Sequence, residues 1–169
     1  MLGAFLGILW SYSRLFVRAS AGRRRFNVLG ALNAITHELV TVTNDTYITA
    51  ESVCELLRRI AQLHLRLPIT LVMDNAAYQK CQMVRDLAAQ LNIELLFLPA
   101  YSPNLNLIEP LWKFVKKKVL YSQYYATFDD FRKAITDCLR QTHTTHKQEL
   151  DSLLTLNFQV FKQRDIVPI

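Results

Sequence analysis

A short apolar segment between a proline and an aspartate constrains the fold of this chain most strongly. Residues 69–73 read ITLVM, Pro68 precedes them and Asp74 follows them. A segment this short and this apolar is typical of a strand that is buried on both faces of a sheet. In open α/β sheets the functional groups gather at the carboxyl ends of parallel strands. Since Asp74 stands at such an end, the segment predicts both a buried sheet and the place of a site.

The flanking segments alternate between strand and helix patterns. Residues 26–32 and 38–43 predict two strands that form an antiparallel hairpin, because only a few residues separate them. Beyond the hairpin, we expect a strand over 93–98 and helices over 49–63, 78–91, 107–120, 127–139 and 149–161. Helices that alternate with short apolar strands indicate a mixed sheet covered on both faces. We therefore expect one α/β domain over 1–169, with a C-terminal helical extension over about 122–169.

The composition excludes several classes of protein. Apolar residues make up 51% of the chain and charged residues 20%. This composition is too apolar for a disordered chain. The three cysteines include no C-x-x-C pair, which argues against a disulfide scaffold or zinc knuckle and suits a reducing cytoplasm. The apolar segment Met1–Trp10 is about half as long as a membrane span. We expect no membrane partner, no targeting signal, and no metal site at the surface or turn histidines His37, His64, His143 and His146.

Positive charge is concentrated in two places. The net charge is +6, and the chain before Glu38 has five arginines and no acidic residue, so that stretch alone contributes +5. The second cluster consists of Lys113, Lys116, Lys117 and Lys118. Such clusters either solubilise the surface or bind a polyanion such as nucleic acid.

Two acidic residues, Asp74 and Glu109, have unusual surroundings. Asp74 closes the most apolar strand, and Glu109 lies among apolar residues in the first turn of a lysine-rich helix. Taken singly, Asp74 can cap the following turn and Glu109 complements the helix dipole. Taken together, the intervening helix and strand can bring both carboxylates to one edge of the sheet. Carboxylates suit Mg²⁺, and two such ions can promote phosphodiester cleavage while the basic clusters hold DNA.

Two blocks of sequence carry a resemblance to a known family. They are residues 73–76 (MDNA) and 98–113 (LPAYSPNLNLIEPLWK), and 34 residues separate Asp74 from Glu109. In these blocks and this spacing the chain resembles the DDE transposases of the mariner superfamily, in their bacterial insertion-sequence branch. Residues 22–31 (GRRRFNVLGA) are similar to the family's second-strand entry. The likeness extends from about Trp10 to Phe161, nearly the whole chain.

The resemblance implies an RNase H-like fold and a metal-dependent endonuclease that cuts and joins DNA during transposition, with water and then a 3′-hydroxyl as attacking groups. In the family's Asp, Asp, Glu triad, Asp74 maps to the second member and Glu109 to the third, and together they would hold two Mg²⁺ or Mn²⁺ ions. The expected phosphate-binding residues are Arg23, Arg24, Arg25, Lys113, Lys116, Lys117 and Lys118; the expected site-shaping residues are Asn75, Tyr101 and Asn106. The partners would be double-stranded DNA (transposon ends and target) and a second copy or a full-length transposase, in the nucleoid of a bacterial cytoplasm.

The first member of the triad has no match in this chain. In the family it lies on the first, central strand, before an apolar stretch that leads to a tryptophan like Trp10. The first aspartate here is Asp45, which follows the second hairpin strand and is misplaced for that role. We expect a chain that begins just downstream of the missing residue and lacks all or part of the first strand, as well as the family's helix-turn-helix region. Its active site would be incomplete, and the chain would be inactive alone.

Three alternatives remain open at the level of sequence. The chain can be a non-catalytic remnant that binds DNA or a full-length transposase. It can be the C-terminal half of a frameshifted or split transposase whose upstream part supplies the first aspartate. It can also be an RNase H-like domain without remaining function. Metal-dependent nicking that requires an upstream segment would favour the split transposase. Salt-sensitive DNA binding without cleavage would favour the remnant, and no DNA binding at low salt would favour the domain without function.

Overall fold

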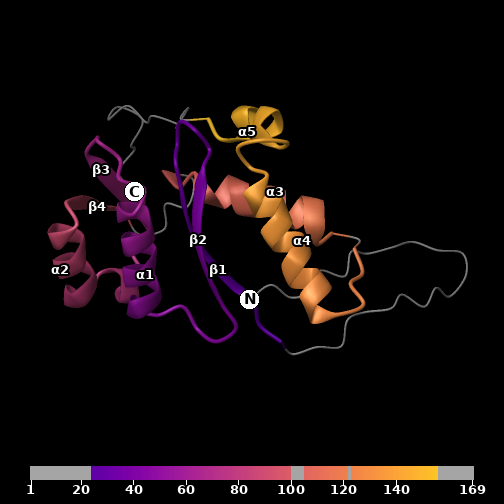
Figure 1. Ribbon diagram of the computed structural model, residues 1–169, viewed down its shortest axis with the longest axis horizontal. Helices are drawn as coiled ribbons and strands as arrows, with labels where there is room; N and C mark the ends of the chain where they lie inside the picture. The colour runs from indigo at the N-terminus through magenta and orange to yellow at the C-terminus, as the bar shows by residue number, and fades with distance from the viewer. Residues whose placement is uncertain (1–23, 100–104, 122, 156–169) are drawn as a thin grey trace, which may run out of the picture.

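The computed structural model describes residues 24–99, 105–121 and 123–155, which form an α/β arrangement. Its elements in chain order are β1 (Asn27–Leu32), β2 (Leu39–Asn44), α1 (Ala50–Ala61), β3 (Ile69–Met73), a 3₁₀ turn (Ala77–Gln79), α2 (Gln82–Gln90), β4 (Ile93–Phe97), α3 (Ile108–Val119), α4 (Phe128–Arg140) and α5 (Lys147–Leu153). The β1–β2 hairpin lies in the middle, with β3, β4, α1 and α2 on one side and α3, α4 and α5 on the other (Figure 1).

The described strands form two separate sheets. β1 and β2 are antiparallel, with Asn27 opposite Asn44, and β3 and β4 are parallel, with Ile69 opposite Ile93. The expected hairpin is therefore confirmed, but a single mixed sheet is not what these residues form. Within 24–99, no strand pairs with both β1 and β3, so each sheet has two strands. The helices, rather than a continuous ladder of hydrogen bonds, join the two sheets.

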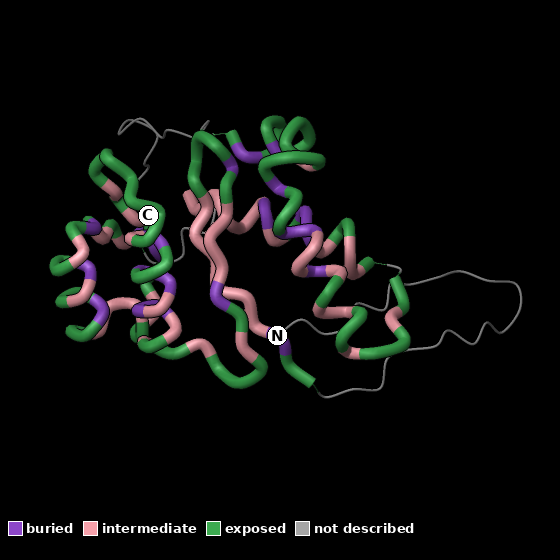
Figure 2. The backbone as a smooth tube through the Cα atoms, in the orientation of Figure 1, coloured by how far each residue is buried: buried purple, intermediate pink, exposed green. Residues whose placement is uncertain are grey.

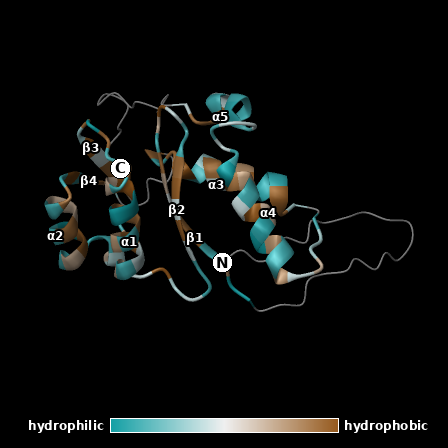
Figure 3. Cartoon of the chain, viewed as in Figure 1, coloured by the Kyte–Doolittle hydropathy of each residue, from teal (hydrophilic) through white to brown (hydrophobic). Residues whose placement is uncertain are grey.

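The hairpin is covered on both faces because both faces of its strands are apolar. Leu29, Ala31 and Val40 pack with α1, β3 and α2 in one apolar core. The alternate residues Val28, Leu32 and Leu39 pack with α3, α4 and α5 in a second core. Successive side chains of a strand point to opposite faces, so one hairpin supplies the inner wall of both cores. Figure 3 shows these strands as mainly hydrophobic, and Figure 2 shows them as mainly half-buried.

The described residues cover the β3–β4 sheet on one face only, which differs from the expectation that residues 69–73 are buried on both faces. Ile69, Leu71 and Met73 pack into the core with α1 and α2. On the other face Val72 is 43% exposed and Leu96 is 51% exposed. The segment is apolar enough for a doubly covered strand, but the described chain places helices on one side of it.

The caps of two helices follow the sequence closely. Thr49 and Ser52 form a capping box at the start of α1, and the Thr127 side chain accepts a hydrogen bond from the Asp130 N–H at the start of α4. The amphipathic stripe of α1 is buried through Ile60, but Leu63 lies beyond the helix and is exposed.

Two helices differ from the sequence predictions. The helix expected over 78–91 begins as a 3₁₀ turn, and α2 itself starts at Gln82. The helix expected over 149–161 is α5, which ends at Leu153; residues 156–161 lie outside the described residues.

Among the described helices none is long and apolar enough to span a bilayer.

His37 belongs to the hairpin turn, as expected, but it is buried rather than exposed. Its Nδ1 lies 3.1 Å from the Asp151 carboxylate of α5. Its backbone has φ = 60°, in the left-handed region that turns often require. The turn therefore contributes a polar contact to the packing of α5.

Candidate functional site

Asp74 lies directly after β3, at the carboxyl end of the parallel β3–β4 pair. Its side chain is exposed, so solvent ions can reach it without passing through a cavity. The backbone N–H of Leu98 donates to the carbonyl of Met73 at 2.9 Å, which extends the parallel ladder to the residue before Asp74. The position of the Asp74 backbone is thus set by the sheet.

Asn106 joins Asp74 to the beginning of α3. Its Nδ2 donates a hydrogen bond of 2.8 Å to Oδ1 of Asp74 across 32 positions of sequence. Its Oδ1 accepts from the N–H of Ile108 at 3.2 Å, and its backbone carbonyl accepts from the N–H of Glu109 at 3.2 Å. One asparagine therefore ties the strand-end aspartate to the helical turn that carries Glu109.

Glu109 occupies the first turn of α3 and is half-buried. Trp112, one turn further along, places its ring 3.3 Å from the position a Cβ would take on Gly30 of β1. The absence of a side chain at Gly30 lets α3 approach the hairpin closely. The hairpin therefore supports the helix that presents Glu109.

The donor set near Asp74 is partly suited to a hard divalent ion. Carboxylate oxygens are the ligands Mg²⁺ prefers, and Asp74 and Glu109 offer two of them. Among the described residues, however, no group of three or more His, Cys, Asp or Glu side chains is arranged to hold a metal. These residues can supply two acidic ligands, and further ligands would have to come from water, substrate or another part of the protein.

The charge of Asp74 also affects Tyr78, which lies in the 3₁₀ turn that follows β3. Burial raises the pKa of the Tyr78 phenol, and the negative charge of Asp74 raises it further. Both effects disfavour the phenolate, so Tyr78 stays protonated at neutral pH. Tyr78 carries no motif of its own in the sequence; its place four residues after Asp74 is the signal that points to it.

The lysines of α3 divide into an accessible group and a paired residue. Lys113 and Lys117 are exposed, Lys116 is half-buried, and none of the three forms an ion pair with another described residue. Their spacing places them on one side of the helix. Lys118 instead forms an ion pair of 2.7 Å with Glu149 of α5. Three of the four expected phosphate-binding lysines are therefore available to a polyanion.

The other expected site residues fall in different places. Arg24 and Arg25 are exposed at the start of β1, away from the Asp74–Asn106 contact and next to α4. Asn75 is exposed beside Asp74. Arg23 and Tyr101 lie outside the described residues.

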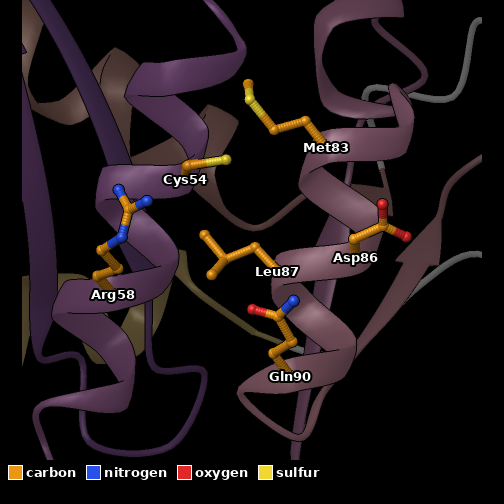
Figure 4. A pocket seen from close by; sticks show the side chains of 6 residues that line it. All are labelled: Cys54, Arg58, Met83, Asp86, Leu87 and Gln90. Atoms are coloured by element: carbon orange, nitrogen blue, oxygen red, sulfur yellow. The ribbon is translucent and has the colours of Figure 1, made fainter.

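A cavity of about 480 Å³ lies between α1 and α2, apart from these residues. Figure 4 shows Cys54 and Arg58 on one helix opposite Met83, Asp86, Leu87 and Gln90 on the other. Burial raises the pKa of the Cys54 thiol, so the reactive thiolate is disfavoured. The positive charge of Arg58 lowers the pKa of that thiol, but burial is the larger effect.

Comparison with known proteins bears on both family and fold. The profile of the family described as DDE superfamily endonuclease matches residues 13–132. No curated protein matches the chain.

Among solved structures, a chain of the simian T-cell lymphotropic virus intasome in complex with PP2A regulatory subunit B56 gamma matches with a TM-score of 0.54 and 16% identity. The match covers 86% of this chain and 54% of that chain, so this protein spans about half the length of that relative. The likeness supports the expected RNase H-like α/β fold class.

Two structures of the Mos1 mariner transposase catalytic domain are also similar. One matches with a TM-score of 0.48 and 15% identity over 78% of each chain. The other, described with Raltegravir and Mg, matches with a TM-score of 0.48 and 14% identity over 82% of this chain and 84% of that one.

Proposed function

We propose, since this chain belongs to the family of DDE superfamily endonucleases, that it is a transposase catalytic domain in which Asp74 and Glu109 hold divalent cations for DNA strand cleavage and strand transfer. The observation that carries the proposal is the contact of Asn106 with both Asp74 and the turn of Glu109. The Asn106 side chain contacts Asp74, and the Asn106 backbone carbonyl contacts the N–H of Glu109, so one residue connects the two acids of the motif. The proposed unit is one domain over 1–169.

The residues around Asp74 would each have a distinct role. Asp74 and Glu109 would bind Mg²⁺ or Mn²⁺ through carboxylate oxygens, and the bound ions would supply a water of lowered pKa and stabilise the leaving oxygen. Asn106 holds Asp74 with its amide and leaves the remaining carboxylate oxygen for an ion. Asn106 is a positioning residue in this proposal.

The proposed partner is double-stranded DNA, as transposon ends and target. The accessible lysines Lys113, Lys116 and Lys117 extend along the helix that carries Glu109, so a backbone bound there would run close to the metal ligands. Electrostatic contacts of this kind give binding that weakens steeply as salt increases. A homodimer, an insertion-sequence origin and a bacterial nucleoid location remain parts of the proposal that follow from the family resemblance.

The described residues supply only two of the three acids of a DDE triad, and we propose that the chain is inactive alone. The second candidate function is one half of a split or frameshifted transposase, whose other half would supply the third carboxylate. An additional strand that carries an aspartate and pairs with β1 and β3 would both join the sheets and supply the third carboxylate. A non-catalytic DNA-binding or transposase-binding remnant is the alternative if no such strand exists.

The test compares nicking and metal binding in matched variants. The chain would be assayed with supercoiled plasmid and Mn²⁺, alone and fused to the peptide encoded directly upstream of Met1 in each reading frame. We expect nicking only in a fusion that adds an aspartate, and its loss in Asp74→Asn. The control Asp86→Asn removes the same charge from exposed α2 and should nick like the parent.

Calorimetric titration of Mn²⁺ into the unfused chain gives a second readout. Asp74→Asn should weaken Mn²⁺ binding about tenfold or more, because one of two carboxylate ligands is lost, and Asp86→Asn should not. Equal Mn²⁺ affinity in both variants would overturn the assignment of Asp74. Salt-sensitive DNA binding without nicking in any fusion would instead support the non-catalytic remnant.

A further inference from the structure

A second cavity, of about 580 Å³, lies where the start of β1, the end of β2 and the start of α4 meet. Three arginines and two aromatic rings line it, with two aspartates at its edge. The lining residues used below are Arg24, Arg25, Tyr47, Phe128, Asp129 and Arg132. We call this site the arginine–aromatic cavity.

The guanidinium groups of the cavity lie over aromatic rings. The Arg25 guanidinium is 4.4 Å from the centre of the Tyr47 ring, and that of Arg24 is 5.6 Å from the centre of the Phe128 ring. A guanidinium that stacks by its flat face still directs its N–H groups outward in its own plane. Arg24 and Arg25 can therefore keep their stacking contacts while donating hydrogen bonds to an anion.

The loop that carries Tyr47 is fixed by two asparagine side chains. Nδ2 of Asn27 donates to Oδ1 of Asn44 and to the carbonyl of Thr46, each at 2.9 Å. Nδ2 of Asn44 donates to the carbonyl of Tyr47 at 2.9 Å. The Tyr47 side chain is nevertheless 68% exposed. The cavity thus offers an aromatic surface on a backbone that is already ordered, which reduces the entropy lost on binding.

The charges of the cavity leave two arginines for a ligand. Arg132 of α4 forms an ion pair of 3.2 Å with Asp45, so the charge of each is compensated. Arg24 and Arg25 have no ion pair with another described residue, and Nη1 of Arg25 donates only to the carbonyl of Thr46, at 3.3 Å. The remaining carboxylate, Asp129, is exposed in the first turn of α4. An anion is therefore favoured at Arg24 and Arg25, on the β1 side.

We infer that the arginine–aromatic cavity binds one unpaired nucleotide of a DNA strand, with its phosphate at Arg24 and Arg25 and its base stacked on the face of the Tyr47 ring opposite Arg25. The choice of DNA as the polyanion rests on the proposed function, and the choice of an unpaired nucleotide rests on the cavity itself. Bases stack on aromatic rings only when they leave the duplex. An acidic peptide could bind the guanidinium groups, but it would make no use of the Tyr47 ring.

The experiment measures binding of two DNA probes to the full chain by fluorescence anisotropy, in EDTA and at low salt. One probe is a short single strand, and the other is a blunt duplex that contains the same sequence. Tyr47→Ala should weaken binding of the single strand about tenfold, because one base loses its stacking partner, and should change duplex binding less than about twofold. Tyr47→Phe keeps the ring and should bind the single strand like the parent. The matched control is Tyr124→Ala, an exposed tyrosine that does not line the cavity, which should change neither affinity.

A second variant tests the phosphate contact. Arg25→Ala should weaken both probes and lower the slope of log affinity against log salt by about one. Its control is Arg140→Ala, at the far end of α4, where an exposed arginine pairs only with Asp137 among the described residues. Circular dichroism of each variant reports whether it is folded, so that lost binding is not mistaken for unfolding.

The outcomes separate this inference from the proposed function. Equal weakening of both probes by Tyr47→Ala, or full competition by an acidic peptide, would overturn the nucleotide site even if nicking by the fused chain succeeds. Conversely, because the binding assay contains no metal, loss of single-strand binding in Tyr47→Ala with no nicking in any fusion would support the cavity and refute the catalytic proposal.

Discussion

The two sheets of this protein are built from similarly apolar strands but have different surroundings. The β1–β2 hairpin has an apolar core on each face, one with α1 and one with α3 and α4. The β3–β4 pair has a core on one face, and its other face exposes Val72 and Leu96. The hairpin therefore acts as the structural centre of the described chain, and the candidate metal ligands lie outside it, Asp74 directly after β3 and Glu109 in α3.

The hairpin and the β3–β4 sheet also differ in how each is connected to α3. The hairpin is held from both sides, so it can fix the position of α3 through the close contact of Gly30 with Trp112. Asp74 stands on the less covered sheet and reaches α3 through the single side chain of Asn106. Among the described residues, the hydrogen bonds of Asn106 therefore set the position of Asp74 relative to the turn of Glu109.

The largest expected effect compares one valine from each sheet. Val42 of β2 is 7% exposed, whereas Val72 of β3 is 43% exposed. Val42→Lys should destabilise the protein by several kcal/mol, since it places an unpaired ammonium in an apolar core, whereas Val72→Lys should cost less than about 1 kcal/mol. Urea unfolding followed by circular dichroism measures both. Equal losses would contradict the comparison, because they would mean that Val72 is covered in solution.

The strands and most helices could be predicted from the sequence because their signals are local. Apolar runs bounded by proline or polar turns gave the four strands, and the caps Thr49 and Thr127 gave the starts of α1 and α4. The coverage of each strand could not be predicted in this way. Residues 69–73 and 27–32 are both apolar, and their sequence does not specify whether a helix from elsewhere in the chain packs on the second face.

The candidate sites differ in the same respect. Asp74, Asn106 and Glu109 belong to blocks with a fixed spacing, so the sequence identified them, and the structure adds the hydrogen bond between Asp74 and Asn106. The arginine–aromatic cavity was missed except for Arg24 and Arg25, because its residues come from three separate segments with no common pattern. The burial of His37 was missed for a similar reason: its contact, Asp151, belongs to α5, more than a hundred positions away.

An intermediate effect is expected at the contact between the hairpin and α3. A methyl group added by Gly30→Ala would lie 3.3 Å from the Trp112 ring and from Cδ1 of Leu39, so the helix or the ring must shift slightly. We expect a loss of about 1 to 2 kcal/mol, since overpacking in a closely packed layer is destabilising. Urea unfolding measures the loss.

The double variant Gly30→Ala, Trp112→Phe tests this cause. Trp112→Phe alone should destabilise the protein, but in the double variant the smaller ring relieves part of the clash. The double variant should therefore lose less free energy of unfolding than the sum of the two single losses. Thr70→Ala, on the exposed face of β3, is the control; it loses only a solvent-exposed hydrogen bond to Glu94 and should be nearly neutral. Strict additivity of the two costs would show that α3 does not rest on Gly30.

The smallest expected effect concerns the ion pair that joins α3 to α5 on the outer side of the hairpin. The Lys118 ammonium, 2.7 Å from the Glu149 carboxylate, lowers the pKa of that carboxyl below its ordinary value of 4.5. A carboxyl whose pKa is lower in the folded state stabilises the fold above pH 4.5, and this contribution is lost as the pH falls through the folded-state pKa. Since both side chains are exposed, the shift in unfolding midpoint should be smaller than for Gly30→Ala. Glu149→Gln should match the parent in acid and be slightly less stable at neutral pH.

The variant Glu149→Gln also frees the Lys118 ammonium to bind DNA. Its affinity for duplex DNA at low salt should therefore rise modestly, although the fold is less stable. A fall in affinity would mean that Lys118 does not lie on the DNA-binding side of α3.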